Sequence, residues 1–160
     1  MREISILDRF LPRSIDNAYR GHKLGLWLFA ALAFVKAAMG MNCIFNGYSV
    51  ASSADGIPLD AFPSGASQTI VAHFALWGLC QFLFGLLGLL ILIRYRALVP
   101  FAFAVFLLEH LSRKLILQFL PVFTTGTPPG FYINLLFLAV MIVGLALSLL
   151  SRSILQAREV

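Results

Sequence analysis

Charged residues are scarce in this chain, and their scarcity excludes several classes of protein. Only 12% of the 160 residues are Asp, Glu, Lys or Arg, which is about half the share found in soluble domains. A disordered chain combines low hydrophobicity with high charge, and a nucleic-acid-binding module carries a basic patch on a polar domain. Neither description fits, although the formal net charge is +5, because long apolar runs separate the cations. We therefore expect no nucleic-acid partner.

Cysteine is also rare, and the usual catalytic motifs are missing. The two cysteines, Cys43 and Cys80, lie in apolar segments without metal-ligand spacing, so we expect neither a disulfide scaffold nor a zinc site. The sequence contains no nucleophile elbow, HExxH motif, phosphate-binding loop or dinucleotide-binding glycine motif. His73 and His110 lie in apolar runs, but their depths differ too much for the axial ligands of one haem. We predict no cofactor and no metal.

Apolar residues, in contrast, are abundant. They make up 60% of the chain, and the mean hydropathy is +0.90. Four apolar runs of about 20–25 residues are each long enough to cross ~30 Å of hydrocarbon. They cover Leu24–Gly47, Thr69–Ile93, Leu98–Leu120 and Phe131–Leu150. Because lipid cannot satisfy backbone polar groups, each run is expected to be helical. The predicted fold is all-α, a single membrane domain over residues 1–160 built as a transmembrane four-helix bundle.

The first 23 residues form a separate element. Ile4, Leu7, Phe10 and Leu11 recur at helical spacing among charged residues. This pattern predicts a short amphipathic helix that lies in the membrane interface, and Pro12 would end it. A tail without regular structure is the alternative.

The distribution of Lys and Arg predicts the orientation. Nine of these cations precede the first run, lie between the second and third runs, or follow the fourth. The other two connections contain no Lys or Arg, and their only charges are Asp55 and Asp60. Since cytoplasmic loops carry the excess of Lys and Arg, both termini are expected in the cytoplasm. The predicted location is the cell membrane, crossed several times (the inner membrane in a Gram-negative bacterium).

Four charges lie inside the apolar runs: Lys36, Glu109, Arg113 and Lys114. A charge at the bilayer centre costs at least ~2.5–3.5 kcal/mol, and such residues usually face the bundle interior and have partners. The helix rise places Lys36 and Glu109 at similar depths, which predicts an ion pair between the first and third runs. Arg113, four residues after Glu109, competes for the same carboxylate. Three cations against one carboxylate leave an excess of two. Lipid phosphate, a bound anionic ligand, water in an outward-facing cavity or a shifted Lys pKa would each account for it. An ion-paired helix whose cations snorkel to the interface, with no ligand, is the alternative.

Other polar residues gather in the outer half of the runs. His73 and Gln81 repeat at helical spacing in the second run, and His110 and Gln118 do so in the third. Such stripes pack inward, so we predict a polar pocket that opens to the outer side above a dry inner half. The candidate ligand-binding residues are Lys36, Asn42, His73, Gln81, Glu109, His110, Arg113, Lys114 and Gln118.

Three hypotheses for function follow. The first is a small non-enzymatic membrane protein that binds a polar or anionic, lipid-like group in this pocket. The second is a structural or assembly subunit whose buried charges pair with another protein, in a homo-oligomer or a larger membrane complex. The third is a membrane enzyme that uses Glu109 or His110 on a lipidic substrate.

Overall fold

The structure is a computed structural model that describes residues 6–12 and 14–150. It is all-helical, with no strand among these residues, as the composition predicts. The four long helices are α2 (Lys23–Phe45), α4 (Ser64–Arg94), α5 (Val99–Phe119) and α6 (Pro129–Leu149). The short elements are α1 (Ile6–Phe10), α3 (Gly47–Ser49), η1 (Val50–Ala54), η2 (Leu59–Ala61) and η3 (Arg96–Leu98).

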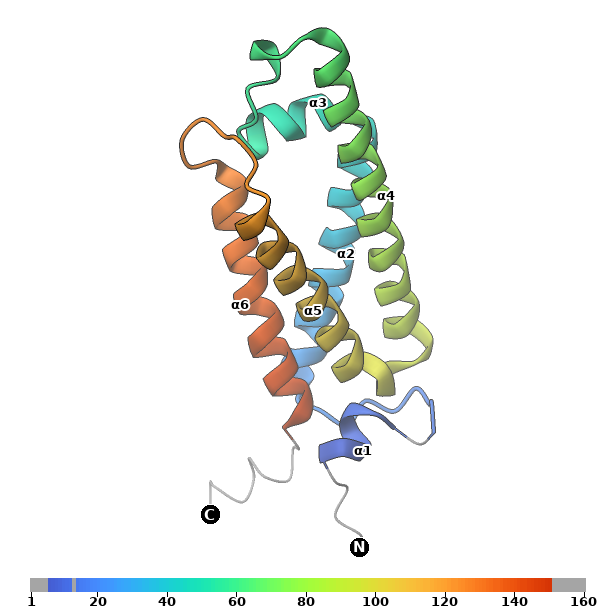
Figure 1. Ribbon diagram of the computed structural model, residues 1–160. Helices are drawn as coiled ribbons and strands as arrows, with labels where there is room; N and C mark the ends of the chain where they lie inside the picture. The colour runs from blue at the N-terminus through green and yellow to red at the C-terminus, as the bar shows by residue number, and fades with distance from the viewer. Residues whose placement is uncertain (1–5, 13, 151–160) are drawn as a thin grey trace, which may run out of the picture.

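The long helices alternate in direction along one elongated bundle (Figure 1). One end, called here the terminal end, holds α1, the start of α2 and the ends of α4 and α6. The opposite end, called the loop end, holds α3, η1, η2 and the connection 120–128. Backbone hydrogen bonds agree with this arrangement, because His22 N donates to Leu147 O at the terminal end and Thr125 N donates to Gly56 O at the loop end.

Three of the long helices, α2, α4 and α6, are long and apolar enough to cross a membrane. By length and composition they indicate a multi-pass protein embedded in a membrane. Helix α5 is not among them, because Glu109, Arg113 and Lys114 all lie on it. The apolar run predicted at residues 69–93 begins earlier in the structure, since α4 starts at Ser64. Nothing in its polar first turn breaks a helix, and Pro63 suits the position just before it.

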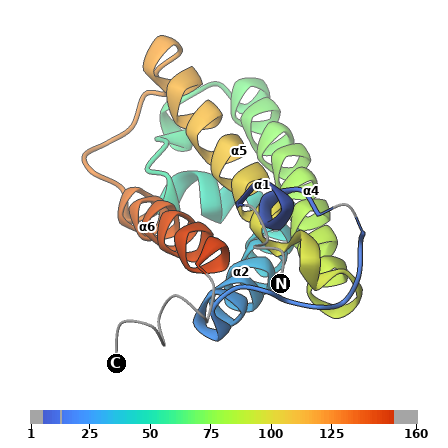
Figure 2. The same ribbon diagram turned by 90° about the horizontal axis from the view of Figure 1, so that it is seen from below.

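The amphipathic helix predicted near the N-terminus is present over Ile6–Phe10, while residues 1–5 lie outside the described part of the chain. It lies across the terminal end of the bundle (Figure 2). The Phe10 ring contacts the Phe101 ring of α5 at 6.0 Å between centroids, and Leu7 remains 66% exposed. One face of α1 therefore packs on the bundle while an apolar side chain points away from it.

Helices α2 and α4 pack with their backbones in contact. A Cβ atom added at Gly85 would lie 2.4 Å from Ala37 N, and one added at Gly40 would lie 2.4 Å from Phe82 N. Gly78 faces Cys43 in the same way. Small residues that let backbones approach closely are the usual basis of helix association in membranes. These glycines therefore fix the α2–α4 pair around which the other helices pack.

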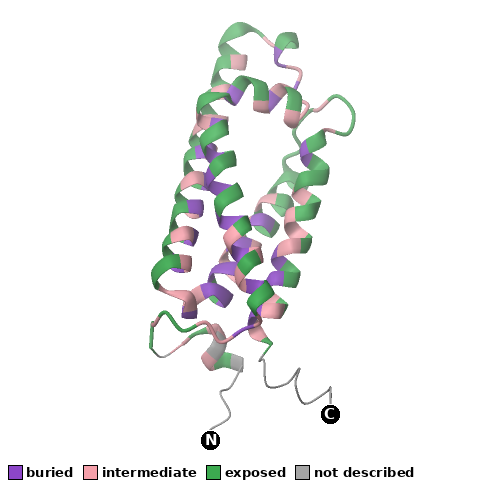
Figure 3. Ribbon diagram, turned by 180° about the vertical axis from the view of Figure 1, so that it is seen from behind, coloured by how far each residue is buried: buried purple, intermediate pink, exposed green. Residues whose placement is uncertain are grey.

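The apolar core lies in the terminal half of the bundle. The Phe29 ring of α2 lies 5.1 Å from the Phe103 ring and 5.8 Å from the Phe106 ring, both of α5. Opposite them, a Cβ at Gly144 of α6 would lie 2.3 Å from the Phe103 ring. Towards the loop end, exposed residues predominate on α5 and α6 (Figure 3). The bundle is thus tightly packed in one half and open in the other.

Replacing Gly85 with Ala should destabilise the protein, because the new methyl group would overlap the backbone of α2. Overpacking of this kind typically costs about 1–3 kcal/mol. The matched control is Gly65→Ala on the same helix, where nothing lies within 4 Å of an added Cβ. Thermal unfolding in detergent should show a lower midpoint for Gly85→Ala and an unchanged or higher midpoint for Gly65→Ala. Equal midpoints would contradict the close α2–α4 contact.

Candidate functional site

Three helices meet in a closed ring of polar side chains near the middle of the bundle. The Lys36 ammonium of α2 donates to Gln81 Oε1 of α4 and to Glu109 Oε2 of α5, the latter at 3.1 Å. Gln81 Nε2 completes the ring by donating to Glu109 Oε1 at 2.8 Å. The ion pair predicted between Lys36 and Glu109 is therefore present, and Gln81 links both partners to the third helix.

The ring rests on the apolar core. Lys36 is only 6% exposed, and its Nζ atom lies 5.4 Å from the centre of the Phe106 ring. A buried ammonium is tolerated only when its charge and its donors are satisfied. The Glu109 carboxylate, the Gln81 carbonyl and the face of Phe106 meet this requirement together. The position of Lys36 in mid-helix thus depends on two other helices.

Arg113 forms a second layer on the loop-end side of the ring. Its Nε atom lies 3.8 Å from Glu109 Oε1, and its guanidinium donates to His110 Nδ1 over 3.2 Å. The guanidinium also lies 4.9 Å from the Trp77 ring centre. Because His110 accepts at Nδ1, its proton is assigned to Nε2 and the imidazole is neutral. The intrahelical pair predicted between Glu109 and Arg113 is also present.

The ring and Arg113 carry two cations and one carboxylate. The sequence analysis included Lys114 as a third cation of this layer. In the structure Lys114 is exposed and does not join the ring. The excess of two charges expected in the layer is therefore reduced to one. The physical reason is helix geometry, since adjacent residues point about 100° apart and Arg113 already takes the inward direction.

The structure thus brings together five of the nine candidate residues, namely Lys36, Gln81, Glu109, His110 and Arg113. The other four are exposed: Asn42, His73, Lys114 and Gln118. Asn42 accepts a hydrogen bond from Asn46, and His73 Nδ1 bonds to Thr69 O one turn earlier. Each of these two side chains thus makes its hydrogen bond to a residue one turn away along the chain rather than to a neighbouring helix.

Sequence reasoning did not include Asp55 in the site. The structure turns this residue of the α2–α4 connection inward, half-buried, against the start of α6. A Cβ at Gly130 would lie 2.6 Å from its Oδ1 atom. Burial raises the pKa of the Asp55 carboxyl, and the charge of Arg113 acts in the opposite direction. The sequence could not predict this inward position, because Asp55 lies in a loop of about twenty residues without periodicity.

Trp77 is the second residue that the candidate list lacked. Its Nε1 atom is buried and has no hydrogen-bond partner, while its ring carries the Arg113 guanidinium. A buried donor without a partner is uncommon in native proteins and costs about 1–3 kcal/mol. Its spacing from Gln81 on the same helix was the available signal, since residues four apart share a face.

After His110, helix α5 packs only loosely against the rest of the bundle. Residues 111–120 are all exposed except Arg113, which is half-buried. The loop end above it is bridged, because Thr125 N and Thr125 Oγ1 both donate to Gly56 O, at 2.9 and 3.2 Å. The Arg113 side chain, which is 26% exposed, thus lies on the open side of α5, while the connections cross over the end of the bundle.

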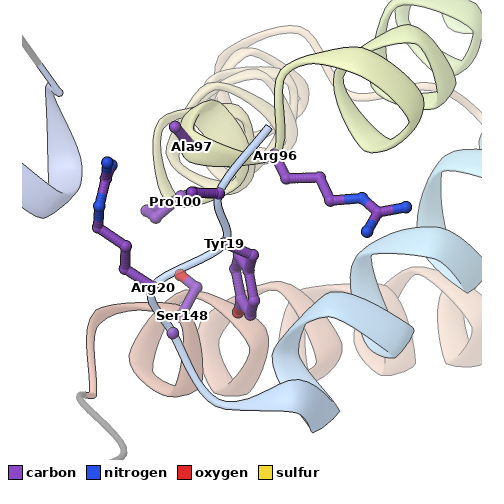
Figure 4. A pocket seen from close by; sticks show the side chains of 8 residues that line it. Tyr19, Arg20, Arg96, Ala97, Pro100 and Ser148 are labelled. Carbon is purple, nitrogen blue, oxygen red and sulfur yellow. The ribbon is translucent and has the colours of Figure 1, made fainter. Parts of the chain in front are cut away.

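Two cavities lie away from the ring. The smaller, at the terminal end, has about 10 Å³, which is room for one water molecule, and Figure 4 shows its lining. The two arginines that line this smaller cavity already have partners in the protein. Arg20 pairs with Asp16 at 2.7 Å, and Arg96 donates to Leu92 O at 2.8 Å. The larger is an open groove of about 520 Å³ at the loop end.

Within the described residues, no group of three His, Cys, Asp or Glu side chains converges as metal ligands would. Comparison of the chain with protein-family models, with curated proteins and with solved structures gives no match. The chemistry of the ring and of its neighbours is therefore the guide to function.

Glu109→Gln should destabilise the bundle by about 3 kcal/mol, because it leaves the buried Lys36 ammonium without its counter-charge. The double variant Lys36→Met with Glu109→Gln should recover most of this loss, since no buried ammonium is then left without its counter-charge, and the half-buried Arg113 loses the same carboxylate in both variants. Lys114→Met is the control on the same helix and should change stability by less than about 0.5 kcal/mol. Unfolding midpoints in detergent test this, and a double variant no more stable than Glu109→Gln would contradict it.

Asp55→Asn should reduce the dependence of stability on pH. The pKa of Asp55 is raised in the folded protein, so its protonated form favours folding. This contribution is complete below the ordinary pKa of 3.8 and is lost as the pH rises through the raised pKa. Above pH 3.8 the unfolding midpoint of the wild type should therefore fall relative to that of Asp55→Asn. Parallel curves for the two proteins would refute the assignment.

Proposed function

We propose that this chain is a four-span membrane protein that binds, without catalysis, an amphiphile with an anionic headgroup beside Arg113. The ring of Lys36, Gln81 and Glu109, together with Arg113 and His110, is called here the polar network. The observation that carries the proposal is the net charge of this network. The network holds Lys36 and Arg113 against Glu109 alone, and Arg113 lies at its open edge. An anion at this edge would balance the remaining charge.

Chain direction supports four crossings. Helices α4 and α6 both end at the terminal end, whereas α6 begins at the loop end (Figure 1). If both helices cross the membrane, the chain must return between Arg94 and Pro129. Helix α5 is the long helix in that interval, and its 21 residues span about 31 Å. Two of its three charges turn towards α2 and α4 rather than towards lipid.

The charges at the two ends support the orientation. Arg20, Lys23, Arg94 and Arg96 lie at the terminal end, whereas the connections 46–63 and 120–128 contain no Lys or Arg. The positive-inside rule then assigns the terminal end to the cytoplasm and the loop end to the outer side of the cell membrane. The anion site would face the outer leaflet.

The donors around Arg113 support an anionic ligand. A guanidinium offers a planar set of donors that suits phosphate and carboxylate groups. On the neighbouring helix α4, the Trp77 ring lies against this guanidinium, and its buried Nε1 atom has no hydrogen-bond partner in the protein. The exposed apolar side chains of α5, such as Leu111 and Leu115, offer a surface for the acyl chain.

Asp55, in the connection at the loop end, interacts electrostatically with Arg113. Since its pKa is raised by burial, the neutral carboxyl is favoured more than it would be in water, and it then leaves the charge of Arg113 unbalanced. An ionised Asp55 would compete with an anionic ligand. Anion binding is therefore expected to strengthen towards acidic pH.

The hydrogen bonds of the ring support binding rather than catalysis. Glu109 accepts from Lys36 and Gln81, and His110 accepts from Arg113 at Nδ1. A general base needs a free lone pair within reach of the proton that it removes. In the network, Glu109 and His110 use their acceptor atoms in hydrogen bonds to Lys36, Gln81 and Arg113.

Lys114 and Gln118 favour a second candidate, an assembly subunit. Both are exposed on α5 among apolar residues, and polar side chains inside a membrane usually face protein or water. A partner helix that covers this side of α5 would satisfy them. This candidate predicts that Lys114 and Gln118, rather than Arg113, are needed for association.

Native mass spectrometry of the detergent-purified protein tests the choice. With phosphatidylglycerol and phosphatidylcholine added in turn, the wild type should retain the anionic lipid preferentially. Arg113→Gln should weaken retention at least about tenfold, since hydrogen bonds to charged groups contribute about 1.5–3 kcal/mol. Lys114→Gln is the matched control, with a neighbouring cation on the same helix, and should behave as the wild type. Equal retention by Arg113→Gln, or loss only in Lys114→Gln, would overturn the proposal.

A further inference from the structure

The groove at the loop end is a second candidate binding site, built from residues that the polar network does not use. It lies between α3, η2 and the first turns of α4, and its volume of about 520 Å³ is within the range of small-molecule sites. Tyr48, Asp60, Phe62, Ser67 and Gln68 are among its lining residues. The site is therefore large enough for a small ligand or a lipid headgroup.

The floor of the groove is held in place by a small core of its own. Leu59 is 2% exposed and packs with Ala51 and Ile57, with Phe62 partly buried against them. The Ser67 hydroxyl donates to Leu59 O at 2.6 Å, which ties η2 to α4. A site held in this way needs little ordering when a ligand arrives.

The groove carries one negative charge and lacks any compensating cation. Asp60 is the charged residue of its lining, and no Lys or Arg occurs in the connections 46–63 and 120–128. The Tyr48 hydroxyl donates to Asp60 Oδ1, which orients the carboxylate and leaves its other oxygen available. Coulombic attraction at this end of the molecule therefore selects cations.

The remaining groups of the groove suit an organic cation. The Ser67 hydroxyl proton is already donated to Leu59 O, and the Tyr48 hydroxyl proton is donated to Asp60. What remains includes carboxylate oxygen and the rings of Tyr48 and Phe62. Aromatic faces and a carboxylate together are the groups that recognise ammonium ligands. We infer that the groove binds an organic ammonium group of the size of choline or ethanolamine.

The position of the groove fits two sources of such a group. Helix α4 has 31 residues and is about 46 Å long, so it exceeds the ~30 Å hydrocarbon core by roughly 16 Å. Its first turns, which line the groove, therefore reach the level of the headgroups if α4 crosses the membrane. The ammonium group belongs either to a free amine or to a zwitterionic lipid headgroup, and both have the same chemistry.

The experiment measures binding of choline chloride to the full-length protein in a maltoside detergent, by NMR chemical shifts of labelled tyrosine. Its neutral isostere 3,3-dimethyl-1-butanol, with sodium chloride added to equal ionic strength, is the ligand control. Choline should shift the Tyr48 signal in a saturable manner, and the isostere should not. Asp60→Asn should weaken choline binding at least tenfold, whereas Asp16→Asn, a carboxylate at the terminal end, should leave it unchanged.

A second arm distinguishes the two sources. In nanodiscs of phosphatidylcholine, the Tyr48 signal should already be shifted and insensitive to added choline if the lipid headgroup occupies the groove. In nanodiscs of phosphatidylglycerol it should respond to choline as in detergent. Equal binding of the isostere, or unchanged choline binding in Asp60→Asn, would overturn the inference. Far-UV circular dichroism of Asp60→Asn checks that the exposed substitution leaves the fold intact.

Discussion

The ion pair between Lys36 and Glu109 is the contact on which the arrangement of the bundle depends. Neither charge is tolerable alone in a hydrocarbon environment, and they come from helices that are far apart in the sequence, joined at 3.1 Å. Their pairing, with Gln81 bonded to both, fixes α5 against α2 and α4 at one depth. An apolar helix could slide or rotate in lipid at small cost, whereas this helix has one position that satisfies its charges.

The two halves of the bundle differ because the ring lies between them. On the terminal side, Phe29, Phe103 and Phe106 fill the interior and exclude water. On the loop side, α5 is exposed beyond His110, and Arg113 faces this open region with one charge not balanced by the ring. The close α2–α4 contact and the aromatic core supply stability. The proposed binding sites are left to the half that contributes least to packing.

The sequence was sufficient to predict the helices and the central pair, because helix length, apolar composition and the rise per residue determine them. The same arithmetic could not separate Arg113 from Lys114, since only the rotation of α5 decides which cation turns inward. It also gave no indication that Asp55, which does lie in the connection after the first run, turns inward and is half-buried, because no periodicity constrains a connection that folds back over the bundle. His73 and Asn42 share a helix face with other polar residues, yet both are exposed and each makes its hydrogen bond to a residue one turn away along the chain. Patterns thus predicted elements and depths, and tertiary packing decided which side chains meet.

We propose that α5, held against α2 and α4 by the ion pair, crosses the membrane as a fourth span. Thiol labelling of intact cells with a membrane-impermeant maleimide tests it most directly, in a protein whose Cys43 and Cys80 are replaced with Ser. A new cysteine at Phe123, just after α5, should react from outside, whereas one at Ala18, at the terminal end, should react only after the cells are opened. Labelling of both positions from the same side would contradict the account.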